Sequence, residues 1–159
     1  MSGTAMNVYL NDHLSGAMLG SALAEQIRSR HQGTPLGALM GSLAPQIEED
    51  RQALIALMSR IGARRNPVKQ TGAWLSEKAS QVKFWGPTSG APELGTYTAV
   101  ETLTLGVLGK LSLWRALAEV ADQYPAIATM DLDDLIGRAH SQYQQLERER
   151  LSAARRAFG

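Results

Sequence analysis

The residues between Pro35 and Ile61 carry the pattern that most constrains the fold of this chain. Apolar side chains recur there in steps that alternate between four and three residues, which aligns them along one face of a helix. The positions on this stripe are Leu36, Met40, Leu43, Ile47, Asp50, Leu54, Leu57 and Ile61. Such a seam is typical of a helix that packs almost parallel to its neighbour. The pattern therefore predicts a long helix with a helical partner.

The composition agrees with a helical protein. The 159 residues include 22 Ala and 21 Leu but only 6 Val and 6 Ile, and unbranched side chains lose little freedom in a helix. The absence of cysteine excludes disulfides, thiolate catalysis and cysteine-bound metal centres. A net charge of +1 gives no global field for nucleic acid or a membrane surface, so we expect neither as a partner.

Helical periodicity is present in four further segments, and local signals mark their ends. Thr34 before a proline predicts an N-cap, Gly62 a C-cap, and Asp131 a second N-cap. The stretch 84–95 holds two prolines and three glycines and is expected to be a loop. The five predicted helices cover about 7–30, 35–61, 66–83, 97–123 and 131–157.

The spacing of these helices predicts the architecture. Short connections join the first helix to the second and the fourth to the fifth, which gives two antiparallel hairpins. Between the hairpins lies a connection of about 35 residues that carries the short third helix. One long crossover between two hairpins is the ferritin-like arrangement. We therefore expect a single all-α domain over 1–159, a ferritin-like up-down four-helix bundle whose long crossover carries a short extra helix. A five-helix bundle with another connectivity is the alternative.

Two charged residues, Asp50 and Lys110, occupy core positions of otherwise apolar stripes, where a charge needs a partner. Pairing the helices about their connections places the polar candidates in one layer of the bundle. These are Asp12, His13, Glu49, Asp50, Lys110 and Glu147. We interpret the layer as an internal salt bridge or hydrogen-bond network, with Asp50 and Lys110 as the expected pair, that determines which helices pair.

A metal site is the alternative interpretation of this layer. A degenerate di-metal centre for iron or manganese would take its ligands from Asp12, His13, Glu49, Asp50 and Glu101. Ferritin-like centres use two Glu-x-x-His motifs, and no acidic residue here is followed three positions later by histidine. A lysine in the same layer would also repel a cation. We therefore predict no metal, cofactor-binding or catalytic residue.

Four glycines lie inside predicted helices, where glycine is costly relative to alanine: Gly16, Gly20, Gly106 and Gly109. Such glycines allow two backbones to approach closely, or they leave room for a ligand. Close packing is the interpretation we favour for them. Trp85, in the predicted loop, is either a core anchor or an exposed contact for a partner.

Segments over nearly the whole chain resemble an uncharacterised bacterial family of the ferritin-like four-helix class. The resemblance rests on residues 9–17 (YLNDHLSGA), 48–51 (EEDR), 74–78 (WLSEK) and 106–115 (GVLGKLSLWR). It implies the four-helix fold and carries over no catalytic residue.

The function expected from these observations is that of a non-enzymatic structural or interaction protein, with a homodimer or another protein as partner. A role in stress physiology is an expectation from fold analogy alone. The alternatives are a ferritin-like metal-binding protein or oxidoreductase, and a small-ligand carrier that uses the space beside the glycines. The N-terminus lacks a signal peptide pattern, and no apolar run approaches the roughly 20 residues of a membrane span, so we expect a cytoplasmic protein.

Overall fold

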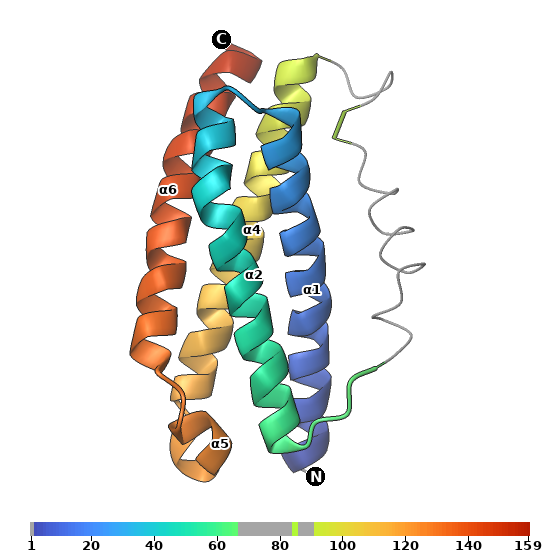
Figure 1. Cartoon of the computed structure of the whole chain (residues 1–159), viewed down its shortest axis with the longest axis vertical. Helices are drawn as coiled ribbons and strands as arrows, with labels where there is room; N and C mark the ends of the chain where they lie inside the picture. Colours follow the sequence, from blue (N-terminus) through green and yellow to red (C-terminus); the bar gives the residue numbers. More distant parts are fainter. Residues whose placement is uncertain (1, 67–83, 86–90) are drawn as a thin grey trace.

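The computed structural model of the chain describes residues 2–66, 84–85 and 91–159. Every regular element in these residues is helical, which confirms the all-α prediction. The long helices are α1 (Ser2–Arg30), α2 (Pro35–Ile61), α4 (Pro92–Ala118) and α6 (Leu132–Phe158) (Figure 1). The 3₁₀ helix η2 (Ala121–Gln123) and the single turn α5 (Pro125–Ala128) lie between α4 and α6.

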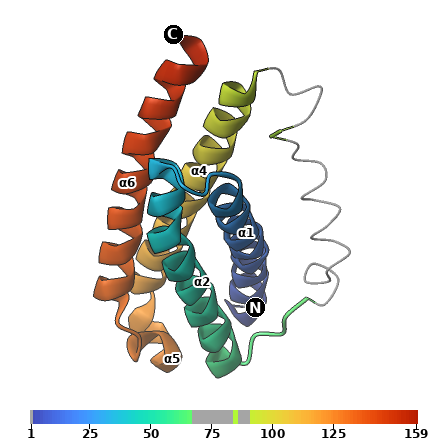
Figure 2. The ribbon, with the colours of Figure 1, turned by 45° about the horizontal axis from the view of Figure 1, so that its top comes forward.

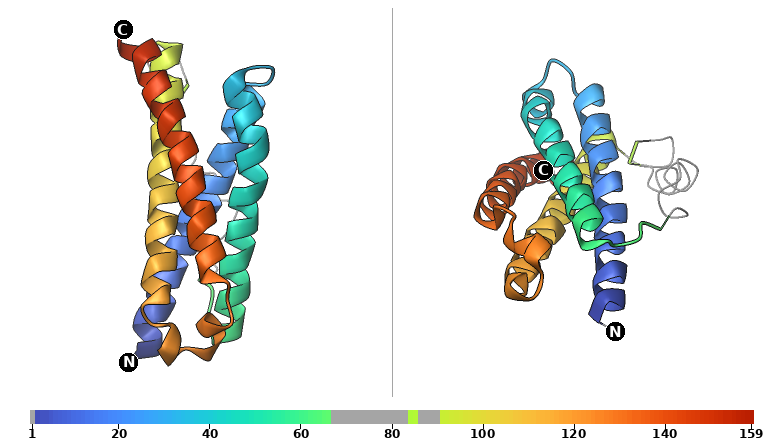
Figure 3. Two further views of the ribbon diagram at one scale, coloured as in Figure 1. Left: turned by 90° about the vertical axis from the view of Figure 1, so that its left-hand side faces the viewer. Right: turned by 60° about the horizontal axis from the view of Figure 1, so that its bottom comes forward.

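The four long helices lie side by side along the long axis of the molecule. Helices α1 and α2 form one antiparallel pair and α4 and α6 another, and α1 also packs against α4 (Figures 1 and 3). Helices α2 and α4 run in the same direction, so the end of α2 and the start of α4 lie at opposite ends of the molecule (Figures 1 and 2).

The three predicted caps are present. The Thr34 hydroxyl accepts a hydrogen bond from the Gly37 N–H at 3.1 Å, which satisfies a donor at the start of α2. Gly62 ends that helix with φ 75°, a left-handed conformation that glycine adopts without steric cost. The Asp131 carboxylate accepts from the Asp134 N–H at 3.0 Å and so begins α6.

Other boundaries differ from the expectation. Helix α1 begins at Ser2 rather than residue 7, and α4 begins at Pro92, inside the stretch predicted to be loop. A proline at the first helical position loses no hydrogen bond, because that N–H would have no intrahelical partner. Helix α4 ends at Ala118 rather than 123, so residues 119–131 form a longer connection than predicted. The predicted helix 66–83 lies almost entirely outside the described residues.

The buried apolar side chains form two clusters, one towards each end of the helices. On α2, Ile47 belongs to the cluster near the α1–α2 turn and Leu54 to the cluster near α5. Each of α2, α4 and α6 carries one buried or nearly buried polar residue where it passes between the clusters: Asp50, Lys110 and Gln142. A polar layer thus separates two hydrophobic cores.

Two glycines one turn apart on α2 test how closely the α1–α2 turn packs against the start of α2. A Cβ on Gly37 would lie 2.0 Å from the backbone oxygen of His31, whereas a Cβ on Gly41 would meet no atom within 4 Å. We expect Gly37→Ala to destabilise the protein by about 1–3 kcal/mol through overpacking. Gly41→Ala should stabilise it by roughly 0.5–1 kcal/mol through helix propensity. Urea unfolding measures both, and equal effects of the two variants would contradict the tight turn at His31.

Candidate functional site

Asp50 is the centre of the polar layer. It follows Ile47 by three residues and precedes Leu54 by four, so the apolar stripe of α2 carries it into the core with a fully buried side chain. A carboxylate there is stable only when its oxygens are paired and hydrogen-bonded. The structure meets this requirement with side chains from α4 and α6.

Both oxygens of the Asp50 carboxylate are paired. Oδ2 accepts hydrogen bonds from Nζ of Lys110 at 2.5 Å and from Nε2 of Gln142 at 3.1 Å. Oδ1 accepts from Nε of Arg138 at 2.8 Å and lies 2.5 Å from Nη2 of the same guanidinium. One carboxylate on α2 therefore connects α4 and α6 through charge-assisted hydrogen bonds.

Further contacts complete the polar layer, which we define as Gln46, Glu49, Asp50, Lys110, Arg138 and Gln142. Lys110 also donates to Oε1 of Gln142 at 2.5 Å, and Nε2 of Gln142 lies 3.3 Å from Oε1 of Gln46. Arg138 donates to the exposed Glu49 carboxylate at 3.0 Å. The two carboxylates and the two cations cancel, so the layer has no formal net charge.

Burial and the Asp50 carboxylate act in opposite directions on the pKa of Lys110. Burial lowers the pKa of the Lys110 ammonium, and the charge and hydrogen bond of Asp50 oppose that shift. The predicted Asp50–Lys110 ion pair is thus present. Since α2 and α4 have few backbone contacts with each other, the pair crosses the interior between helices that are not close neighbours.

The other predicted members of the layer lie elsewhere. Glu147 pairs with Arg150 at 2.7 and 2.8 Å, and Glu101 pairs with the same arginine and with Tyr97. Lys110 lies level with Gln142 rather than with residue 145, because the long connection 119–131 changes the register of α6. Glu147 is consequently more than one turn away along α6.

Asp12 and His13 lie on α1, outside the hydrogen-bonded layer. Asp12 is exposed, whereas His13 is half-buried with its ring against Tyr9, at 4.6 Å between centroids. Burial lowers the pKa of His13, and the charge of Asp12 only partly opposes this. The imidazole is therefore mainly neutral at pH 7.

Sequence reasoning missed the α6 side of the layer. The only residue of the last helix that it placed in the layer was Glu147, whereas the buried residues of α6 are Leu135, Ala139, Gln142, Leu146 and Ala153. From Leu135 to Leu146 they are spaced by four, three and four residues, which is the same pattern as on α2. That spacing was the available signal for Gln142, and the same face also carries Arg138.

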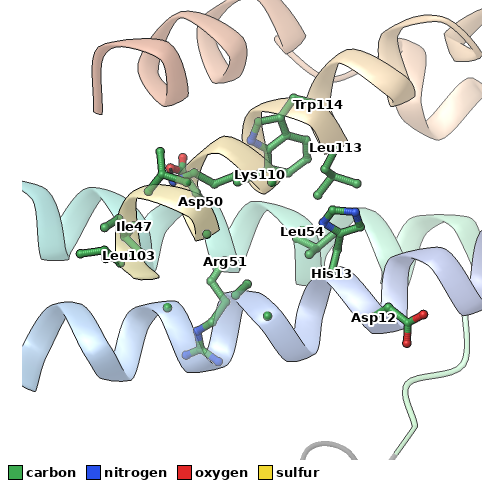
Figure 4. Close-up of a pocket in the computed structure, with 16 residues that line it drawn as sticks. Asp12, His13, Ile47, Asp50, Arg51, Leu54, Leu103, Lys110, Leu113 and Trp114 are labelled. Atoms are coloured by element: carbon green, nitrogen blue, oxygen red, sulfur yellow. Dashed lines mark hydrogen bonds and ion pairs between the residues drawn. The ribbon is translucent and has the colours of Figure 1, made fainter. Parts of the chain in front are cut away.

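A cleft of about 300 Å³ adjoins the polar layer between α1, α2 and α4. Figure 4 shows Lys110 extending towards Asp50, with His13 and Leu113 farther along the helices. We call this space the glycine cleft, because α1 and α4 each contribute two glycines to its lining. It is lined by Asp12, His13, Gly16, Ala17, Gly20, Ile47, Asp50, Arg51, Leu54, Leu103, Gly106, Val107, Gly109, Lys110, Leu113 and Trp114.

The four glycines do not serve close helix packing. A Cβ built on Gly16, Gly20, Gly106 or Gly109 would meet no heavy atom within 4 Å beyond the helix's own backbone and chain neighbours. The favoured close-packing interpretation is therefore wrong for these positions. What the missing side chains leave is open space.

The remaining polar groups of the cleft are restrained by pairing or burial. Arg51 donates to Glu48 at 2.6 and 2.8 Å, and this hydrogen bonding lowers the pKa of Glu48 to about 2. Trp114 is fully buried, and its indole N–H has no hydrogen-bond partner among the described residues. The cleft wall thus includes a residue with a buried, unsatisfied donor.

The candidate metal ligands do not converge. Within residues 2–66, 84–85 and 91–159, no group of three or more His, Asp or Glu side chains is placed to hold a metal ion. Glu49 and Asp50 are engaged by Arg138, and Glu101 by Arg150. Asp12 is directed to the surface of α1.

Comparison of the chain with protein-family models, curated proteins and solved structures finds no match. The site must therefore be interpreted from its own geometry. Among the described helices, none has both the length and the hydrophobicity that a membrane span requires.

Proposed function

We propose that this protein is a non-enzymatic four-helix bundle of ferritin-like up-down topology that binds a small, mainly apolar molecule in the glycine cleft. The observation that carries the proposal is the open space at four helix-interior glycines beside a buried polar layer. The parallel course of α2 and α4 supports the topology (Figure 1).

The cost of these glycines supports a binding role. Glycine inside a helix is less favourable than alanine by about 1 kcal/mol, and no neighbouring atom would oppose a methyl group at any of the four positions. Stability alone would therefore favour alanine. Open glycines also occur outside the cleft, at Gly41 and Gly137, so the support for a binding role comes from four of them lining one cleft.

The lining of the cleft is also that of a ligand site. Apolar side chains such as Leu54, Leu103 and Val107 form most of the wall, and the polar groups are few. Small-molecule sites commonly combine an apolar wall with few polar groups, and their volumes begin at about 300 Å³. The cleft is at the lower end of that range.

The polar layer is better suited to structure than to catalysis. Both Asp50 oxygens already accept hydrogen bonds from cationic or amide donors. A general base needs an oxygen that can reach a substrate proton. The iron or manganese alternative has less support, because Glu101 and Asp12 lie away from Asp50, and Lys110 occupies the position facing its carboxylate.

Naphthalene is a suitable first probe of the cleft. We expect it to bind the wild-type protein saturably, as followed by the ¹³C-methyl resonances of the lining Leu and Val residues. Gly106→Leu places a side chain in the cleft and should weaken binding by about tenfold or more, equivalent to roughly 1.4 kcal/mol. Gly137→Leu on α6 is the matched control, because Gly137 is also open but does not line the cleft.

The proposal fails if naphthalene does not bind the wild-type protein. It fails equally if the folded Gly106→Leu variant binds naphthalene as tightly as the wild type.

A further inference from the structure

We infer that the ligand of the glycine cleft is an uncharged molecule with a hydrogen-bond acceptor, such as a ketone or ether oxygen, and that Lys110 donates to this acceptor. The inference rests on the proposed function and specifies the chemistry of its ligand.

Lys110 retains donor capacity. An ammonium group has three N–H donors, and among the described residues Nζ of Lys110 has two acceptors, one on Asp50 and one on Gln142. Lys110 and Asp50 both line the cleft, and Arg138 does not; the Lys110 side chain is 14% exposed, whereas the Asp50 side chain is fully buried. Lys110 is therefore the cation of the layer that a molecule in the cleft can reach.

Trp114 also lines the cleft, but its indole N–H is itself buried and is not open to a molecule in the cleft. Lys110 is therefore the donor on which the inference rests. A donor without an acceptor favours a ligand that supplies an acceptor over one that supplies another donor.

The charge balance favours an uncharged ligand. Lys110 and Arg138 are compensated by Asp50 and Glu49, and Arg51 is compensated by Glu48. An anion entering the cleft would lose its hydration without meeting an uncompensated positive charge. A neutral oxygen can accept from Lys110 without that penalty.

The volume sets the size of the probe. A cavity of about 150 Å³ holds benzene, so a cleft of about 300 Å³ is large enough for a fused bicyclic aromatic. Three probes of similar shape then distinguish a ligand with a neutral acceptor from an apolar ligand and from an anionic one. They are 2-acetonaphthone, which has a carbonyl; 2-isopropenylnaphthalene, in which a methylene replaces the carbonyl oxygen; and 2-naphthoate, which is anionic.

Dissociation constants of the three probes for the wild-type protein, measured by methyl NMR titration, test the inference. We expect the ketone to bind about tenfold more tightly than the alkene, and the naphthoate to bind more weakly than the ketone. In Lys110→Met, with folding verified by circular dichroism, the difference between ketone and alkene should disappear. If that variant does not fold, the comparison in the wild-type protein decides alone.

The outcomes separate the two proposals. Equal binding of ketone and alkene would overturn the acceptor inference but leave the cleft as a binding site. If the naphthoate binds most tightly, the inference of an uncharged ligand is overturned and the cleft is an anion site. Failure of all three probes and of naphthalene would overturn the inference together with the proposed function.

Discussion

Asp50→Ala is expected to lower the free energy of unfolding by about 3–5 kcal/mol. The substitution removes the acceptor shared by Lys110, Arg138 and Gln142, and it leaves the Lys110 ammonium buried without its counter-charge. A loss of this size is a large fraction of the 5–15 kcal/mol that typically stabilises a domain. Urea unfolding followed by circular dichroism measures it as a lower midpoint at an unchanged slope.

Glu49 is the matched control for this prediction. It precedes Asp50 on α2 and also accepts a hydrogen bond from Arg138, but its side chain is 70% exposed. An exposed ion pair contributes little, so Glu49→Ala should cost less than about 1 kcal/mol. Similar losses for the two variants would show that burial of Asp50 is not what makes it important.

The second large effect is the coupling between Asp50 and Lys110. Asp50→Leu alone leaves the Lys110 ammonium buried without its counter-charge and should cost about 3–5 kcal/mol. Lys110→Met alone removes one of the two cations that pair with the buried Asp50 carboxylate and should cost about 3 kcal/mol. The double variant replaces both charges by apolar groups, so it should lose much less than the sum of the single losses. We expect a coupling energy of at least about 2 kcal/mol from the double-mutant cycle.

The pair Glu48–Arg51 is the control for this cycle. It is an ion pair within α2 at 2.6 Å, with the two side chains 42% and 23% exposed. Its coupling should stay below about 1 kcal/mol, because solvent screens two partly exposed groups on a helix surface. Additive losses for Asp50 and Lys110 would refute the salt bridge as the element that connects α2 with α4.

Much of the local structure could be predicted from single residues and their spacing. The limits of α2, its caps Thr34 and Gly62, and the start of α6 after Asp131 agree with the structure. These features depend on contacts within a few residues, so the sequence pattern contains the information directly. Asp50 and Lys110 were recognisable because each interrupts an apolar stripe.

The partners of Asp50 on α6 could not be obtained in the same way. The register of α6 against α4 depends on the path of residues 119–131, where η2 and α5 replace the short turn that was expected. A shift of three residues brings Gln142 rather than residue 145 level with Lys110. Periodicity identifies which face is buried, but it does not measure the length of a connection.

The glycines show the same difference between what one segment determines and what the packing of several segments determines. Their positions in α1 and α4 are visible in the sequence, but whether a glycine permits close packing or leaves a cleft depends on atoms of neighbouring helices. Local propensity and hydrophobic periodicity are thus sufficient for the existence of the long helices and for the ends that carry a cap, because these arise within one segment. The register, the partners of Asp50 and the open cleft arise only from packing, because they depend on distances of a few ångströms between segments far apart in the chain.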